Sequence, residues 1–170
     1  MDRVNNLALG LVLFQPEIAT NLGAAIRIAA CFDARLHVIE PCGFPWKSKD
    51  IARVAMDYTD LAPPQRHPSW SAFNASPPGR LVLLTTKADQ TIHDHVFQAG
   101  DLIVMGQESA GAPPHVHAAA AARVRIPLGP QARSLNMAVA AAIALSEARR
   151  QIGYTPSDTP RTIDSGPPSA

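Results

Sequence analysis

Apolar and polar segments alternate along the chain, and their lengths predict strands followed by helices. A continuous apolar run of strand length occurs at residues 7–14, and such runs are typical of strands buried on both faces of a parallel sheet. Strands are also predicted at 80–86, which contains LVLLTT, and at 101–105, which reads DLIVM. Shorter strands are predicted at 35–39 and 123–128. The alternation predicts an α/β fold, a mainly parallel sheet with helices on both faces.

Helical spacing appears between these runs. The stripe Ile18, Leu22 and Ile26 predicts a helix over 20–32, capped by Thr20 or Asn21. Further helical segments are expected at 48–56, 69–74, 91–97 and 115–122, and little other structure in the proline-rich stretch 61–78. An alanine-rich helix ends the pattern at about residue 151, and Ser134 is its predicted N-cap.

Size and composition indicate a single domain over residues 1–154. The chain has 170 residues, 46% of them hydrophobic and 17% charged, which is enough for one core. Residues 155–170 contain almost no apolar residues and are predicted to be disordered. No apolar run reaches the roughly 20 residues of a membrane span, and no signal peptide is recognisable, so a cytoplasmic protein without a membrane partner is expected.

The net charge of the whole chain is +1, which argues neither for nor against binding to nucleic acid. Local basic clusters matter more, although each could also be a solvated face. They are Lys47/Lys49/Arg53, Arg66/His67, Arg123/Arg125/Arg133 and Arg149/Arg150.

Ligands of open α/β sheets bind at the carboxyl ends of the strands, so the loops after Phe14, Thr86, Met105 and Leu128 are the candidate sites. The phosphate-binding patterns GxGxxG and GxxxxGK[ST] are absent. The loop GQESAG at 106–111 offers two glycines and a carboxylate, although it could also be a plain turn.

Neither metal binding nor hydrolysis is indicated by the sequence. The pairs His93/His95 and His115/His117 lack a third ligand nearby, so no metal is expected. No GxSxG elbow is present, and Cys31 and Cys42 are expected to be buried free thiols.

Three loop segments, taken in order, resemble the motifs of a known family. NLGAAIR at 21–27, GQESAG at 106–111 and RIPLGPQARSLN at 125–136 are similar to the three motifs of the SPOUT, or trefoil-knotted, RNA methyltransferases. The match is closest to the small single-domain subfamily that methylates the ribose 2′-hydroxyl of the wobble nucleotide (position 34) of tRNA, and it extends over residues 7–154. The resemblance implies S-adenosylmethionine as cofactor, a C-terminal trefoil knot, the tRNA anticodon region as partner, and a homodimer with sites at the subunit interface.

The resemblance also implies roles for particular residues. Arg27 would hold a phosphate or stabilise the developing alkoxide, because a guanidinium hardly deprotonates. As further catalytic residues, Asn21 would orient its own loop and Glu108 the adjacent one, while Asn136, together with Ser134, would hold cofactor and substrate. The predicted cofactor-binding residues are Leu84, Thr85, Thr86, Gly106, Gly111, Ile126, Leu128, Ser134 and Leu135. The predicted tRNA contacts are Lys47, Arg53, Arg133 and Arg149.

Several positions depart from the family pattern and leave alternatives open. Ala110 and Ala132 stand where arginine and serine are common, Met137 to Ala140 replace Leu-Ser-Asn-Ala, and Ser146 replaces an aromatic residue. These departures motivate a second hypothesis, a catalytically inactive RNA-binding relative of the same fold. A third is a small-nucleotide-binding enzyme without an RNA substrate, which the missing phosphate loops disfavour.

Overall fold

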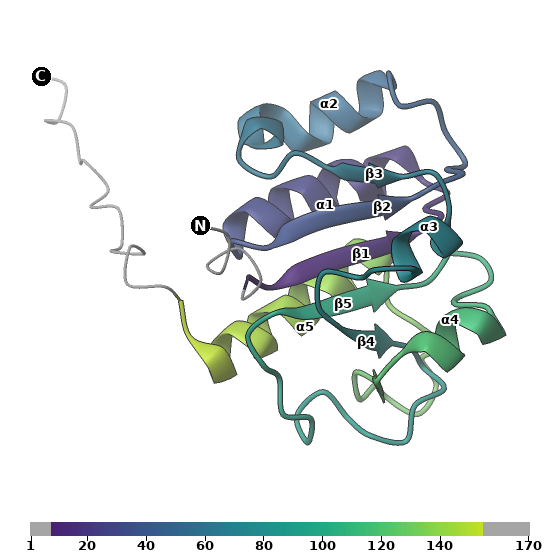
Figure 1. Cartoon of the computed structure of the whole chain (residues 1–170), viewed down its shortest axis with the longest axis vertical. Coiled ribbons are helices and arrows are strands. Elements are labelled where there is room, and N and C mark those ends of the chain that lie inside the picture. The colour runs from purple at the N-terminus through teal and green to yellow at the C-terminus, as the bar shows by residue number, and fades with distance from the viewer. Residues whose placement is uncertain (1–7, 155–170) are drawn as a thin grey trace, which may run out of the picture.

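The central sheet is fully parallel. A computed structural model describes residues 8–154, so the predicted disorder at 155–170 lies outside the described residues. The sheet has the order β3-β2-β1-β5-β4-β6 (Figure 1). Its strands are β1 (Gly10–Phe14), β2 (Arg35–Ile39), β3 (Gln65–His67), β4 (Arg80–Leu84), β5 (Asp101–Met105) and β6 (Ala122–Val124). The predicted α/β class and parallel sheet are confirmed.

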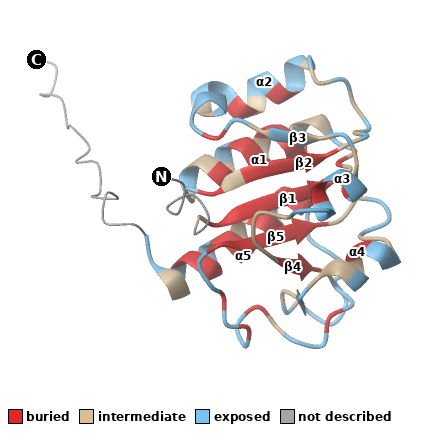
Figure 2. Ribbon diagram, viewed as in Figure 1, coloured by how far each residue is buried: buried red, intermediate tan, exposed pale blue. Residues whose placement is uncertain are grey.

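Helices cover both faces, as predicted. On one face α1 (Ala19–Cys31), α2 (Lys49–Ala55) and α5 (Met137–Ile152) form one apolar core with the sheet, and a 3-10 helix, η2 (Met56–Asp60), follows α2. On the other face α3 (Trp70–Asn74) and α4 (Pro114–Ala119) form a second core. Central strands are buried along their length (Figure 2), which explains their uninterrupted apolar sequences.

Three sequence-based expectations about elements are wrong. Residues 91–97 form no helix, because this segment pairs with the chain after β6: the Ile92 amide donates to the Arg125 carbonyl and the Arg125 amide to the Gln90 carbonyl. The last strand ends at Val124 instead of reaching 128, and residues 126 and 128 line a cavity instead. The short strand β3 was not predicted, because its sequence QRH has no apolar pattern.

The caps of the two long helices also differ from the prediction. The α1 N-cap position is Ile18, whose side chain cannot cap, and Thr20 and Asn21 lie inside the helix. The N-cap of α5 is Asn136, not Ser134: its Oδ1 accepts from the amides of Ala138 and Val139 at 2.9 and 3.2 Å. The sequence offered several capping residues, and only tertiary contacts determine which one acts.

A histidine pair is buried under the second core. The His37 side chain is 1% exposed, and its Nδ1 lies 3.1 Å from Nε2 of His67, with the two rings stacked. Burial, followed by the charges of His67 and Arg35, lowers the pKa of His37 to about 4. Protonation of His37 is therefore easier in the unfolded chain than in the folded one.

We expect the free energy of unfolding to fall as the pH drops from about 6.5 toward 4, with His37 contributing on the order of 2 kcal/mol. His37→Phe should have a shallower pH profile in that window, because the proton-binding group is gone. Urea unfolding at several pH values measures this. The exposed His93→Gln serves as control and should keep the wild-type slope, whereas parallel profiles for wild type and His37→Phe would refute the assignment.

Candidate active site

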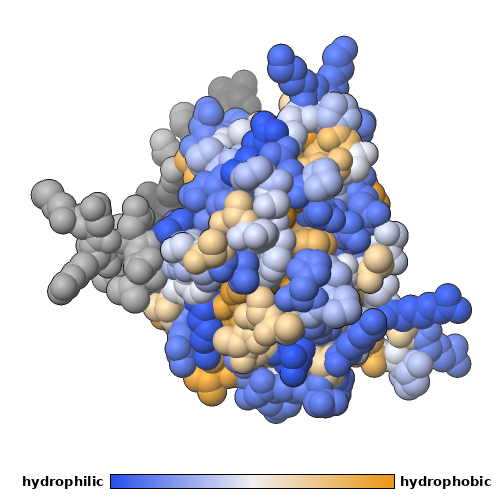
Figure 3. Space-filling model, turned by 45° about the vertical axis from the view of Figure 1, so that its right-hand side comes forward, coloured by the Kyte–Doolittle hydropathy of each residue, from blue (hydrophilic) through white to orange (hydrophobic). Residues whose placement is uncertain are grey.

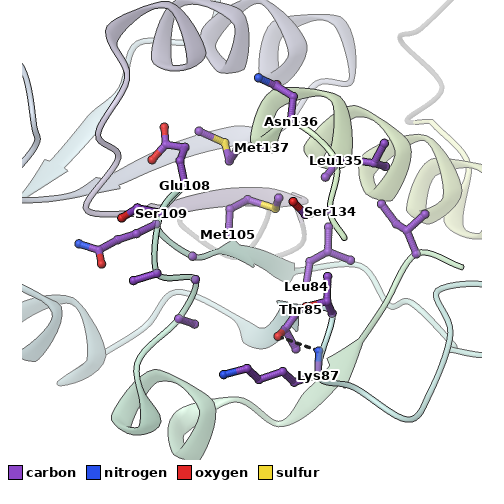
Figure 4. Close-up of a pocket in the computed structure, with 18 of the residues that line it drawn as sticks. Leu84, Thr85, Lys87, Met105, Glu108, Ser109, Ser134, Leu135, Asn136 and Met137 are labelled. Carbon is purple, nitrogen blue, oxygen red and sulfur yellow. Dashed lines mark hydrogen bonds between the residues drawn. The ribbon is translucent and has the colours of Figure 1, made fainter. Parts of the chain in front are cut away.

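A cavity of about 560 Å³ opens at the carboxyl ends of β4 and β5. It lies beside the boundary between β1 and β5, where the strand order reverses, and this is the usual ligand position in open α/β sheets. Its walls come from the loops that follow β1, β4, β5 and β6 and from the first turn of α5 (Figure 4). The volume is within the range of small-molecule sites.

All nine residues predicted to bind a cofactor line this cavity. They are Leu84, Thr85, Thr86, Gly106, Gly111, Ile126, Leu128, Ser134 and Leu135. Their role in cofactor binding stays a prediction, but the structure brings them together from segments up to 51 positions apart. Sequence reasoning missed other lining residues, among them Met105, Met137 and Ala140, because buried strand ends and helix starts carry no motif of their own.

The cavity is lined by apolar and polar side chains together. Leu84, Met105, Ile126, Leu128 and Met137 supply apolar surface, whereas serine, threonine and amide side chains lie around them. Such a division suits a ligand with a flat apolar ring and a polar end.

Gly106 is required by the loop itself. A Cβ at this position would lie 2.4 Å from the Ala112 amide nitrogen, so no other residue fits without moving backbone. Gly111 has φ +70° and exchanges two backbone hydrogen bonds with Gln107. The glycines therefore shape a tight turn first, and they expose its backbone to the cavity as a consequence.

Glu108 supplies the missing cap of α1 from a distant loop. Its Oε2 accepts from the Glu17 amide at 2.8 Å, and its Oε1 accepts from the Ile18 amide at 3.3 Å and from Nδ2 of Asn21 at 3.2 Å. A carboxylate at a helix amino end is favourable, because it pairs orphan amides and meets the positive end of the helix dipole. The loop after β5 is thereby fixed to α1.

Two asparagines continue this network to α5. Nδ2 of Asn136 donates to Oδ1 of Asn21 at 3.0 Å, while Oδ1 of Asn136 caps α5. The direction of every bond is determined, because the carboxylate of Glu108 only accepts and the α5 amides only donate. Glu108, Asn21 and Asn136, predicted as catalytic positioning residues, form one hydrogen-bonded chain across three loops beside the cavity.

A reciprocal contact reinforces the first of these links. The carboxylate of Glu17 accepts from the amide and the hydroxyl of Ser109, each at 2.8 Å. These two hydrogen bonds lower the pKa of Glu17. The loops after β1 and β5 thus bind each other in both directions.

Arg27 does not reach the cavity of its own chain. It is exposed on α1, with Nη1 3.7 Å from Sδ of Met56 and its Cζ 5.3 Å from the centre of the Tyr58 ring. Asn21, on the same helix, lines the cavity. Within one chain, therefore, the arginine and the predicted cofactor pocket are separate.

The predicted tRNA contacts divide into two groups. Lys47, Arg53 and Arg133 are exposed, and Arg53 also pairs with Asp50 at 3.1 Å. Arg149 is only 7% exposed, and its guanidinium donates to the carbonyls of Phe32 and Asp33 at 2.7 and 2.6 Å. The prediction for Arg149 is wrong, because this side chain caps the carboxyl end of α1 and is not free to hold a phosphate.

The paired histidines are separated in space and function. His95 is buried beside Phe97, His115 packs edge-on against Phe14, and His117 lines the cavity. Within residues 8–154 no group of three potential ligands forms a metal site. No helix in this part of the chain is long and apolar enough to span a membrane.

Comparisons with known proteins converge on one family. The sequence matches the SpoU rRNA methylase family over residues 8–146, which include every cavity-lining residue. A tRNA (cytidine(34)-2′-O)-methyltransferase of Beijerinckia indica is 49% identical over 146 residues, covering 84% of this chain and 91% of that relative.

Solved structures agree with the sequence match. A structure described as giving insights into the 2-OH methylation of C/U34 on tRNA has a TM-score of 0.80 and 37% identity, over 86% of this chain and 97% of that one. An AdoMet-bound rRNA methyltransferase from Sinorhizobium meliloti has a TM-score of 0.78 and 27% identity, over 84% of this chain and 56% of that one.

Asn21→Asp should destabilise the fold by about 2–3 kcal/mol at about pH 8, because it places a second carboxylate against Glu108. The penalty should shrink toward about pH 5, since the raised pKa of the new pair lets the folded state bind a proton that the unfolded state does not. Urea unfolding of variant and wild type at both pH values measures the difference.

Asn74→Asp, at an exposed position of α3, is the matched control and should show a small, pH-independent effect. A pH-independent penalty for Asn21→Asp would contradict the charge contact with Glu108.

Proposed function

The chain belongs to the SpoU rRNA methylase family, and from this premise we propose that it transfers the methyl group of S-adenosylmethionine to the ribose 2′-hydroxyl of nucleotide 34 of tRNA. One observation carries the proposal: the relative that is 49% identical over nearly its whole length is named for this reaction. The cofactor assignment agrees with the AdoMet-bound family structure. Acting on tRNA, the protein would work in the cytoplasm.

The cavity suits S-adenosylmethionine. Leu84, Ile126, Leu128 and Leu135 offer apolar walls for an adenine ring, and the 106–111 turn presents backbone groups beside them. When bound, the cofactor supplies a methyl group on a sulfonium, which is electrophilic without further activation. The protein's task is then to hold the ribose hydroxyl in line with that methyl group and to exclude water.

Leu84, Ile126, Leu128 and Leu135 would hold the cofactor, which would supply the methyl group for a new bond to the ribose oxygen, with the sulfur leaving as a neutral thioether. The 2′-hydroxyl would give up its proton to solvent water, and negative charge would grow on the oxygen before its bond to the methyl carbon is complete. A guanidinium close to this oxygen would stabilise that charge without deprotonating. Arg27 is our candidate for this role, as the family resemblance implies.

Because Arg27 lies off the cavity of its own chain, the proposal includes a homodimer in which Arg27 serves the cavity of the partner. The solvent side of α5 supports this: Val139 is 49% exposed, and Phe32, Ile92, Ala142, Ile143 and Ser146 line a shallow apolar groove beside it. The departures at Val139 and Ser146 fall on this surface, where they would change dimer packing more than the cavity.

The proposal also includes a C-terminal trefoil knot, as the family resemblance implies. β6 lies at the edge of the sheet, whereas α5, the next element, returns to the centre and contacts α1 and β5. Residues 125–136 make that return.

Mass spectrometry of nucleosides tests the proposed reaction. Incubation of purified protein with S-adenosylmethionine and unmodified tRNA should yield a ribose-methylated nucleoside mapping to position 34, because a relative named for this product is 49% identical over 146 residues. Methylation at another position would contradict the substrate assignment. Binding of tRNA without any binding of S-adenosylmethionine would instead favour the inactive RNA-binding alternative.

Arg27→Ala should abolish methyl transfer and leave S-adenosylmethionine affinity within about twofold of wild type, because Arg27 lies off the cavity. Calorimetry and a transfer assay measure the two effects. Mixed dimers of Arg27→Ala with Ala140→Phe, which narrows the cavity, should recover activity if Arg27 acts in the partner's site. Loss of cofactor binding in Arg27→Ala, or mixed dimers without activity, would contradict this arrangement.

A further inference from the structure

Three basic residues from three parts of the chain lie near one another on one side of the cavity. Lys87 follows β4, His117 is on α4, and Arg123 is on β6. Lys87 and His117 line the cavity, while Arg123 is exposed outside it and donates from Nη1 to the His117 carbonyl at 3.3 Å. In Figure 4 Lys87 lies at the end of the cavity opposite Asn136 and Met137. We call these three residues the basic rim.

The basic rim has no acidic partner in the described part of the chain. Neither Lys87 nor Arg123 is among the ion pairs formed within residues 8–154. Glu108 is the one carboxylate among the residues that line the cavity, and it already accepts hydrogen bonds from the Glu17 and Ile18 amides. Positive charge thus accumulates on one side of the cavity without being neutralised.

His117 is affected by the charges of both Lys87 and Arg123. Its pKa is lowered, first by burial and then by the charges of Lys87 and Arg123. The ring of His117 can also donate a hydrogen bond beside these two cations. An anion placed there would meet two positive charges and one further donor.

The basic rim extends from the lining of the cavity to the outer surface of the protein. A small carboxylate enclosed in the cavity would need Lys87 or His117 but not Arg123, which lies outside. A polyanion passing over the mouth would use all three. On the face shown in Figure 3, hydrophilic side chains cover much of the surface and project from several sides, with hydrophobic patches between them.

We propose that Lys87, His117 and Arg123 bind a backbone phosphate of the tRNA beside the ribose that enters the cavity. The inference rests on the proposed function and gives the RNA a second point of attachment, distinct from Lys47, Arg53 and Arg133. These are positioning residues: they hold the strand so that the 2′-hydroxyl reaches the methyl group, and they take no part in the chemical step.

The test compares Lys87→Ala/Arg123→Ala with the charge-preserving Lys87→Arg/Arg123→Lys. At about 0.1 M salt the alanine pair should bind tRNA roughly tenfold or more weakly, because two charged contacts are lost. The slope of log affinity against log salt should fall by about 1.5, whereas the charge-preserving pair should stay close to wild type. Calorimetry should show unchanged S-adenosylmethionine affinity in both.

Two outcomes would overturn the inference. Wild-type tRNA affinity and salt slope in the alanine pair would show that no phosphate is bound at the basic rim. Weakened S-adenosylmethionine binding with intact tRNA binding would show that the rim holds the cofactor's carboxylate instead. Failure of the proposed function is seen separately, as absence of methylation at nucleotide 34 by the wild-type protein.

Discussion

The carboxylate of Glu108 is the contact on which the site depends. It closes the amino end of α1, which has no capping side chain of its own, and orients Asn21. Asn21 in turn orients Asn136, the cap of α5. One ionised group therefore fixes the relative positions of two helices and the loop after β5, and the cavity is the space left between them. Removing one member of this network would destabilise the fold more than having no polar network there, because the remaining buried amides would lose their hydrogen-bond partners.

This rigidity fits the proposed chemistry. Methyl transfer from a sulfonium needs little from a protein beyond an aligned nucleophile and a site closed to water. The cavity walls are set by strand ends and by a glycine turn that tolerates no side chain at Gly106. The residues proposed to touch RNA are, by contrast, mostly exposed basic side chains: Lys47, Arg53 and Arg133, together with the basic rim. In the proposed arrangement the RNA contacts depend mainly on charge and the cofactor contacts mainly on apolar walls, so salt should affect them differently.

Much of the fold can be predicted from the sequence, because strands that are buried on both faces of the sheet have mainly apolar sequences. The β5 strand has the predicted bounds, and the short helix α3 lies within the segment 69–74 that was predicted to be helical. Elements whose position depends on partners elsewhere could not be predicted. Residues 91–97 are held by backbone bonds to the chain after β6, and Ile18 starts a helix only because Glu108 lies above it. Arg149 looks from sequence like its exposed neighbour Arg150, and only the packing of α5 against α1 distinguishes them. The motifs indicate the site from the sequence, whereas His117 belongs to no motif and only its place in the cavity lining identifies it.

The most direct test uses two tRNA molecules that differ only in the 2′-hydroxyl of nucleotide 34, replaced by hydrogen in one of them. With methyl-labelled S-adenosylmethionine, the protein should transfer label to the intact tRNA and none to the deoxy-substituted one, although it should bind both. Equal labelling of the two would place the acceptor elsewhere and contradict ribose methylation at nucleotide 34.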